Sequence, residues 1–300
     1  IIQSNIHHLL MKSPLLFCCL ACAAVTPALA DSGDDFGLWT EATVQKAFSK
    51  SFSIDGGLEF RLDDKFSQPS RWAVSAGASY KPLKYLSLGA SYVFIHDYKS
   101  EEVKAKYETD ETGAPELDDA GRPILDGYNV EQGYWRNRHR ALLEVTGKVE
   151  AGRFTFSLRE RYQYTRYVGE TIQQHKFRNP IPEVLLPSFT GSKYEYAGTT
   201  FSEHSVDPDV KESKDKHYLR SRLQVEYNIN HCHWTPYVSY ELVNDLQDKF
   251  DLEKGRLKVG AEWKITKKHR LDVAYLWDKD ADDESNSNHH VISLGYKFKF

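Results

Sequence analysis

The stretch of sequence that decides the fold is H-H-V-I-S-L-G-Y-K-F-K-F, residues 289–300. Its apolar and polar residues fall on opposite faces, Ile292, Leu294, Tyr296, Phe298 and Phe300 against Ser293, Gly295, Lys297 and Lys299. A period of two is typical of a β-strand with one apolar face. Ten upstream segments alternate in the same way, and no further helices or strands are evident that could cover their apolar faces. The sequence therefore predicts an all-β fold, a transmembrane antiparallel up-and-down β-barrel in a single domain.

The composition is compatible with such a barrel. Mean hydropathy is -0.58, which would exclude a bundle of membrane helices, but a barrel strand needs an apolar residue only at every second position. After residue 30 no apolar run is long enough for a spanning helix. Aromatic residues make up 13% of the chain and could supply interfacial girdles. A sequence pI of about 6.3 gives no reason to expect a nucleic-acid partner.

The N-terminal region is predicted to be a targeting segment. Residues 1–10 precede a plausible initiator, Met11, and are interpreted as an upstream extension. Residues 11–30 contain Lys12, an apolar run and a final Ala-Leu-Ala, the pattern of a signal peptide. A lipid anchor is a weaker alternative, because no cysteine of this segment has both the small residue and the leucine that lipidation needs. Residues 31–300 would then form the barrel, with Cys232 as their single cysteine.

The alternating segments number eleven: 38–48, 52–62, 72–80, 85–94, 135–149, 153–166, 218–229, 234–243, 256–265, 270–277 and 289–300. Bacterial single-chain barrels close with even strand numbers, so we expect 10–12 strands and one miscounted strand, for which 192–201 is a candidate. Two connections are much longer than the rest, 97–133 and 167–216. Loops of this length are functional or disordered, and we expect them outside the cell.

Predicted turns set residues of neighbouring strands opposite one another. Three predicted hairpins place opposite charges face to face inside the barrel: Glu144 with Arg159, Arg222 with Glu241, and Lys264 with Asp272. Glu160 conflicts with the pattern because it falls on the apolar face, and a β-bulge would be needed to turn it inward.

The polar faces together predict a charge network in the lumen, made of Arg136, Arg138, Arg140, Glu144, Arg159, Arg161, Arg220, Arg222, Glu226, Glu241, Lys264 and Asp272. Such a lumen could attract a small anionic solute, because a narrow low-dielectric channel focuses the field of its charges. The same residues could instead form a plug of ion pairs. The function expected is that of a small porin-like channel or a surface binding or structural protein.

The alternative is an outer-membrane lipid-modifying enzyme. His139 and Glu160 both face outward, but the predicted register sets them about 13 Å apart along the strand, too far for a catalytic pair. We therefore predict no catalytic residue. We also predict no metal site and no cofactor, because the Asp-rich run 278–283 has Asp283 where a calcium loop needs glycine.

Several motifs resemble a known family of outer-membrane proteins from Bacteroides-like bacteria, labelled domain of unknown function 2490. They are D-F-G-L-W at 35–39, E-F-R at 59–61, R-N-R-H-R at 136–140, R-E-R-Y-Q-Y at 159–164, Y-L-R-S-R-L at 218–223, P-Y-V-S-Y-E at 236–241 and R-L-K-V-G-A-E-W-K-I-T-K-K-H-R-L at 256–271. The resemblance implies a barrel in the outer membrane of a Gram-negative bacterium, with no established activity. It also implies that the arginines and Glu241 occupy positions of the family pattern.

The C-terminal residues Tyr296, Phe298 and Phe300 resemble the signal that barrel-assembly machinery recognises in its clients. The expected partners are thus that machinery, outer-membrane lipids and lipopolysaccharide. We expect the protein to be a monomer.

Overall fold

The computed structural model describes residues 35–280 and 289–300. The predicted upstream extension and signal peptide lie outside the described residues. Strands make up nearly all of the regular structure in the described part of the chain, together with a short 3-10 turn at Glu183–Leu185. The protein is therefore all-β, as the alternation predicts.

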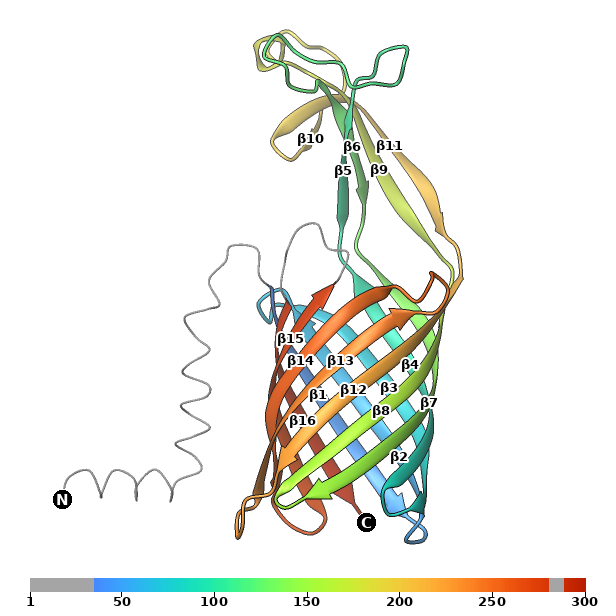
Figure 1. The fold of residues 1–300 in the computed structure, drawn as a ribbon. Coiled ribbons are helices and arrows are strands. Elements are labelled where there is room, and N and C mark those ends of the chain that lie inside the picture. The colour runs from blue at the N-terminus through green and yellow to red at the C-terminus, as the bar shows by residue number, and fades with distance from the viewer. Residues whose placement is uncertain (1–34, 281–288) are drawn as a thin grey trace, which may run out of the picture. The chain divides into compact units, whose positions relative to one another are not determined.

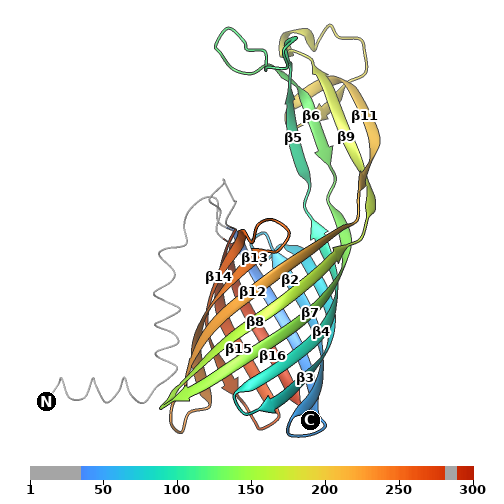
Figure 2. The same cartoon turned by 45° about the vertical axis from the view of Figure 1, so that its right-hand side comes forward.

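Eleven strands close into a barrel within the described residues. Their order around the barrel is β1-β16-β15-β14-β13-β12-β8-β7-β4-β3-β2 (Figures 1 and 2). The strands are β1 (Asp35–Ala47), β2 (Phe52–Asp63), β3 (Gln68–Leu83), β4 (Leu86–Lys99), β7 (Tyr134–Ala151), β8 (Phe154–Tyr167), β12 (Lys214–Tyr227), β13 (Trp234–Asp245), β14 (Leu252–Lys264), β15 (His269–Asp280) and β16 (His289–Lys299).

The closing pair of strands corrects the expectation of an even number. β1 pairs with β16 in parallel, in a register that runs from Asp35 opposite His289 to Gln45 opposite Lys299. When each strand runs opposite to the one before it, an odd number of strands leaves the first and last pointing the same way. No strand is missing from the sequence count, and the candidate at 192–201 contributes β10 and the first residues of β11 to another sheet.

That other sheet comes from the two long connections. It has five strands in the order β10-β11-β9-β6-β5, and belongs to a second unit formed by His96–Arg138 and Arg166–Lys214. Its strands are β5 (Glu102–Tyr107), β6 (Leu125–Glu131), β9 (Glu170–Pro180), β10 (Tyr194–Tyr196) and β11 (Thr199–Lys211). β6 pairs with β9, so the two connections are joined by backbone hydrogen bonds. Fully buried Phe201 lies between Tyr128 and Phe177 and forms a small aromatic core.

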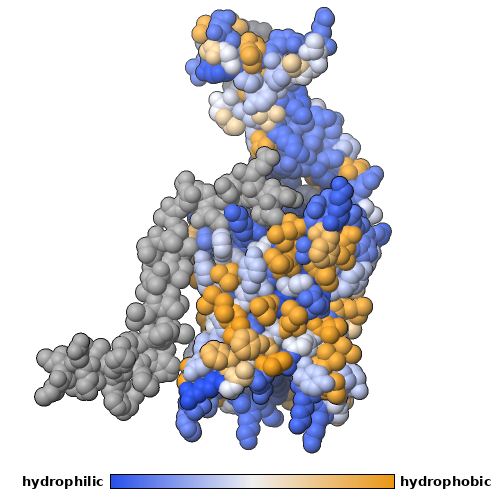
Figure 3. All heavy atoms as spheres, in the orientation of Figure 1, coloured by the Kyte–Doolittle hydropathy of each residue, from blue (hydrophilic) through white to orange (hydrophobic). Residues whose placement is uncertain are grey.

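Polarity along the barrel strands is reversed relative to a soluble protein. In β8, Thr155, Ser157 and Arg159 are buried, whereas the alternate residues Phe156 and Leu158 are exposed. The other strands repeat this arrangement, and Figure 3 shows hydrophobic residues gathered over the outer face of the barrel. Every second side chain of each strand points into the enclosed space. Many of these inward side chains are polar or charged, so the inner face of the barrel is polar.

The turns decide which inward residues meet. Arg222 lies opposite Glu241, as predicted. The β7–β8 turn begins one residue later than predicted, at Gly152, whose φ of +63° suits glycine. Moving a turn by one residue shifts each cross-strand partner by two, so Glu144 forms its ion pair with Arg161, two residues along from the predicted Arg159.

The β14–β15 turn corrects a second predicted pair for the same reason. Thr266 donates its backbone N–H to the carbonyl of His269, so the turn lies one residue earlier than predicted. Lys264 is consequently opposite Arg270, and Asp272 is opposite Glu262.

Candidate functional site

Glu241 is the centre of the largest ion-pair cluster on the inner wall of the barrel. Its side chain is 5% exposed and lies on β13. Arg159 of β8 donates to its Oε2 at 2.5 Å, and Arg220 of β12 donates to its Oε1 through both Nε, at 3.2 Å, and a terminal nitrogen. Arg256 of β14 lies 3.8 Å from the same Oε1. One buried carboxylate thus holds arginines from three strands.

Uncharged side chains extend this cluster towards β7. Arg220 donates to Gln163 Oε1 at 3.0 Å, and the Gln163 amide donates to Thr165 Oγ1 at 3.2 Å. Arg140 of β7 donates to the same hydroxyl oxygen at 3.3 Å. Gln163 and Thr165 are buried, so the inner wall is tied together by satisfied polar contacts rather than by apolar packing.

The second ion pair, Glu144 with Arg161, lies against a wall of small residues. Arg161 donates through Nε at 3.0 Å and through Nη2 at 2.6 Å to one Glu144 oxygen. A Cβ on Gly89 would lie 2.7 Å from Glu144 Cγ. The glycine therefore makes room for the carboxylate, which explains a small residue on the inner face of β4.

Arg222 differs from the arginines around it. It faces Glu241 in the strand register, yet Glu241 is held by Arg159, Arg220 and Arg256. The described residues offer Arg222 no hydrogen bond or ion pair, and its Nε is buried without a partner. Its guanidinium is thus available to a further anion.

A further charged cluster, outside the predicted network, lies on the facing wall. Glu59 accepts from Arg61 Nε at 2.7 Å and lies 3.6 Å from Arg71. The guanidinium of Arg61 stacks over the ring of Trp39 at 3.6 Å, and that of Arg256 lies 5.1 Å from the same ring. β14 and β1 are not neighbours in the sheet, so the arginine and tryptophan meet inside the barrel. The inward parity of 59, 61 and 256 could have indicated this cluster.

Two further predicted residues, Arg136 and Arg138, lie in the second unit. Arg136 donates to the carbonyl oxygens of Val168, at 2.8 Å, and Glu212, at 2.6 Å. Arg138 forms a buried ion pair with Asp97. The structure therefore gives both arginines contacts among the residues that lead into the long connections.

The remaining predicted residues form local pairs. Glu226 accepts from the Gln224 amide at 2.8 Å, and Asp272 accepts from Lys258 at 2.9 Å and from Tyr237 at 2.7 Å. Lys264 is exposed beside the β14–β15 turn.

No bulge turns Glu160 inward. The inward parity of β8 is the same before and after Glu160, because Arg159, Gln163 and Thr165 are all buried, and Glu160 keeps its outward position between Leu158 and Tyr162. Ser221 of β12 donates to Glu160 Oε2 at 2.6 Å. A hydroxyl of the neighbouring strand thus satisfies this outward carboxylate.

Outward histidines meet tyrosines. His139 Nδ1 lies 2.6 Å from the hydroxyl of Tyr92, and His269 Nδ1 lies 2.7 Å from that of Tyr296. These contacts pair His139 with a phenol rather than with Glu160. At the C-terminus, the rings of Phe298 and Phe300 stack at 5.7 Å.

Charges in the second unit are largely balanced within its own sheet. Lys211 of β11 donates to Glu131 at 2.6 Å and lies 2.8 Å from Asp209. Partial burial alone would lower the pKa of Lys211, but hydrogen bonds to Asp209 and Glu131 outweigh it, so the pKa is raised. Lys176 pairs with Asp207 at 2.9 Å.

Within residues 35–280 and 289–300, no helix is long and apolar enough to cross a membrane. Comparison with protein families found one match: the sequence profile described as "Protein of unknown function (DUF2490)" matches residues 36–289. A comparison with curated proteins found no match.

Proposed function

We propose that this chain, which belongs to the DUF2490 family of proteins of unknown function, is an outer-membrane β-barrel that binds a small anion on its inner wall. The proposed membrane location is supported by the reversed polarity of the barrel. Large apolar side chains such as Leu58, Leu158 and Leu223 are more than half exposed, whereas Arg159 and Glu241 are buried. Such a surface would aggregate in water and matches the apolar outer band of membrane barrels.

The arginine excess supports anion binding. Neighbouring strands β8 and β12 direct Arg159, Arg161, Arg220 and Arg222 to one part of the inner wall. Glu241 and Glu144 are the carboxylates in contact with three of these arginines, and Arg222 is left over. An anion with two or three oxygens could accept from Arg222 and the free donor of Arg159, because guanidinium groups bind such anions bidentately.

The ion pairs argue against free flow of solute. Arg159 reaches past β12 to Glu241 on β13, and Arg256 reaches the Trp39 ring from a non-neighbouring strand. We therefore expect a lumen that is closed at rest. Binding, rather than steady conduction, is the function that this geometry supports best.

Location and binding are tested separately. Quenching of tryptophan fluorescence by brominated lipids should show strong contact with acyl chains for refolded protein in vesicles. Refolded protein in planar bilayers should show no steady conductance, and isothermal titration with inorganic phosphate should show one saturable site.

Arg222→Gln should abolish phosphate binding. Arg153→Gln is the matched control, because Arg153 lies in an exposed turn and its side chain donates to the Tyr227 hydroxyl, at 3.4 Å, rather than to a carboxylate. A steady anion-selective current through the wild-type protein would refute the closed lumen and indicate that the protein is a channel. Equal phosphate affinity in both variants would refute the assigned anion site.

A further inference from the structure

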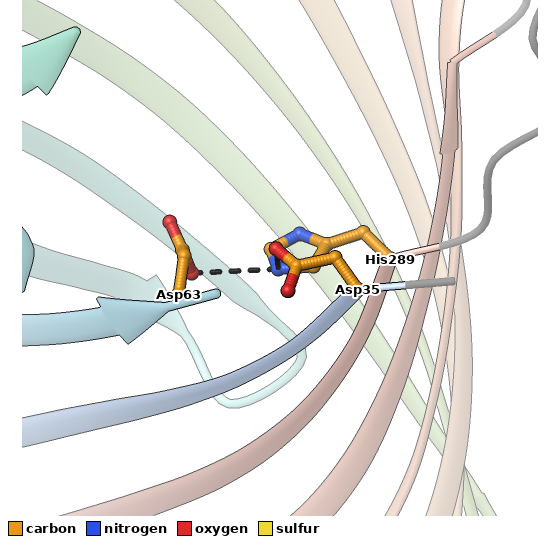
Figure 4. A group of neighbouring side chains, drawn as sticks. All are labelled: Asp35, Asp63 and His289. Carbon is orange, nitrogen blue, oxygen red and sulfur yellow. Dashed lines mark ion pairs between the residues drawn. The ribbon is translucent and has the colours of Figure 1, made fainter. Parts of the chain in front are cut away.

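The barrel seam brings together three side chains that the charge network does not use: Asp35 of β1, Asp63 of β2 and His289 of β16 (Figure 4). Their potential ligand atoms all lie within 4.8 Å of one another. His289 Nε2 is 3.6 Å from Asp35 Oδ2 and 3.4 Å from Asp63 Oδ1. From this geometry we propose that the three residues form a binding site for a first-row divalent metal ion of the Zn²⁺ class.

The distances fit a shared ion better than hydrogen bonds. Bonds of about 2.0–2.2 Å to a tetrahedral ion set two ligand atoms about 3.3–3.6 Å apart. A hydrogen bond from imidazole to carboxylate would be about 2.7–2.9 Å. His289 Nε2 and Asp63 Oδ1 are both buried atoms without a hydrogen-bond partner in the described residues, so each has a lone pair or proton unaccounted for.

The backbone orients one ligand and leaves space for the ion. Asp35 Oδ1 accepts the backbone N–H groups of Phe36, at 2.7 Å, and Lys65, at 3.3 Å, which leaves Oδ2 to face His289. Gly37 lies beside the three ligand atoms. A Cβ there would come within 2.7 Å of Asp63 Oδ1 and 3.1 Å of His289 Nε2, so glycine keeps this space clear.

Charge balance also favours a cation. In the described part of the chain, neither Asp35 nor Asp63 forms an ion pair with a lysine or arginine; the imidazole is their shared partner. Arg61 is the nearest cation along β2, and it is held by Glu59 at 2.7 Å and by the Trp39 ring. Two carboxylates and an imidazole suit ions that accept both nitrogen and oxygen ligands.

Such an ion would join three strands at the closing seam of the barrel. β1 and β16 pair in parallel there, and parallel pairing is slightly less stable per residue than antiparallel pairing. The ion would link β16 to β1 and β2, so metal binding should stabilise the closed barrel.

The test uses refolded, tag-free protein that has been stripped with a chelator. Addition of Co²⁺ should produce the visible absorption of a tetrahedral ion at one equivalent, Zn²⁺ should displace it, and Zn²⁺ should raise the temperature of unfolding. Asp63→Asn and His289→Gln should each weaken Zn²⁺ affinity at least 100-fold.

Gly37→Ala is the sharpest variant, because it fills the space without removing a ligand; it should also abolish binding. Gly147→Ala is its control, since a Cβ at Gly147 meets nothing within 4 Å. His233→Gln controls for the loss of a histidine outside the proposed site. Retention of the heat-modified gel shift by each variant shows that the barrel has folded. Binding that survives in both His289→Gln and Gly37→Ala, or a wild type that binds no Zn²⁺ at micromolar concentration, would overturn the proposal.

Discussion

Replacement of Glu241 by glutamine should destabilise the barrel strongly. Glu241 contacts three arginines, but they do not depend on it equally. Arg256 keeps Asp278, at 2.7 Å, and Arg220 keeps Gln163, at 3.0 Å. Arg159 has no second ion-pair partner in the described residues.

In the described residues, Arg159 therefore loses its counter-charge and its acceptor, whereas Arg220 loses its counter-charge but keeps the neutral Gln163 amide oxygen as an acceptor. Breaking a buried ion pair from one side costs about 3–5 kcal/mol, and glutamine retains one acceptor oxygen, so the expected loss is about 3 kcal/mol. Glu226→Gln is the matched control. Its carboxylate contacts the Gln224 amide and lies at a partly exposed position, so its loss should cost less than about 1 kcal/mol.

The assay is equilibrium unfolding in urea of protein refolded into lipid vesicles, followed by tryptophan fluorescence. A double variant, Arg159→Gln with Glu241→Gln, should recover at least about 1.5 kcal/mol, because it removes the arginine charge that is left with neither a counter-charge nor an acceptor. If the free energy of unfolding of Glu241→Gln lies within about 1 kcal/mol of the wild-type value, the inner wall is hydrated and the estimate for a buried ion pair is wrong. If the losses of unfolding free energy in the two single variants simply add in the double variant, the specific pairing of Glu241 with Arg159 is refuted.

Two further predictions concern the second unit. Gly127→Ala should separate β6 from β9, because a Cβ at Gly127 would overlap the carbonyl oxygen of Phe177. Limited proteolysis of this variant should then cut within the long connections and leave the barrel intact. Unchanged protection from the protease would contradict the β6–β9 pairing. The pKa of Asp110 is lowered from its ordinary value of 3.8 by hydrogen bonds from the Thr112 hydroxyl and then from the backbone N–H of Ala114. These bonds are present at neutral pH and are lost as the pH falls through the lowered pKa, so the shift of the Thr112 and Ala114 amide resonances should have its midpoint below pH 3.8. A midpoint at or above 3.8 would show that the turn does not hold the carboxylate.

The faces of the strands could be predicted from sequence because alternation is a local property. Arg159 and Glu241 were assigned to the interior from residue parity alone, and both are buried there. Parity could not choose between registers that differ by two, since both put the same residues inside. That is why Glu144 was paired with Arg159 and not with Arg161, which lies on the same face.

Partners that cross between non-neighbouring strands lie further beyond sequence reasoning. Arg159 reaches Glu241 past β12, and Arg256 on β14 reaches Trp39 on β1 past β15 and β16, so neither contact follows from a hairpin. Two of the strands within the long connections, β5 and β10, could not be predicted for a different reason. β5 is exposed along its whole length, and β10 has three residues, too few to show alternation.

The proposed metal site could not be predicted because it depends on how the barrel closes. Asp35 begins β1 and His289 begins β16, and parallel pairing sets these two residues side by side. In a barrel with an even number of strands the last strand would run antiparallel to the first, and Asp35 would face the C-terminal end of β16 instead. The three ligands can therefore converge only because the strand number is odd. The feature that first suggested a missing strand is thus the one that assembles Asp35, Asp63 and His289, and loss of metal binding should accompany any variant that changes the β1–β16 register.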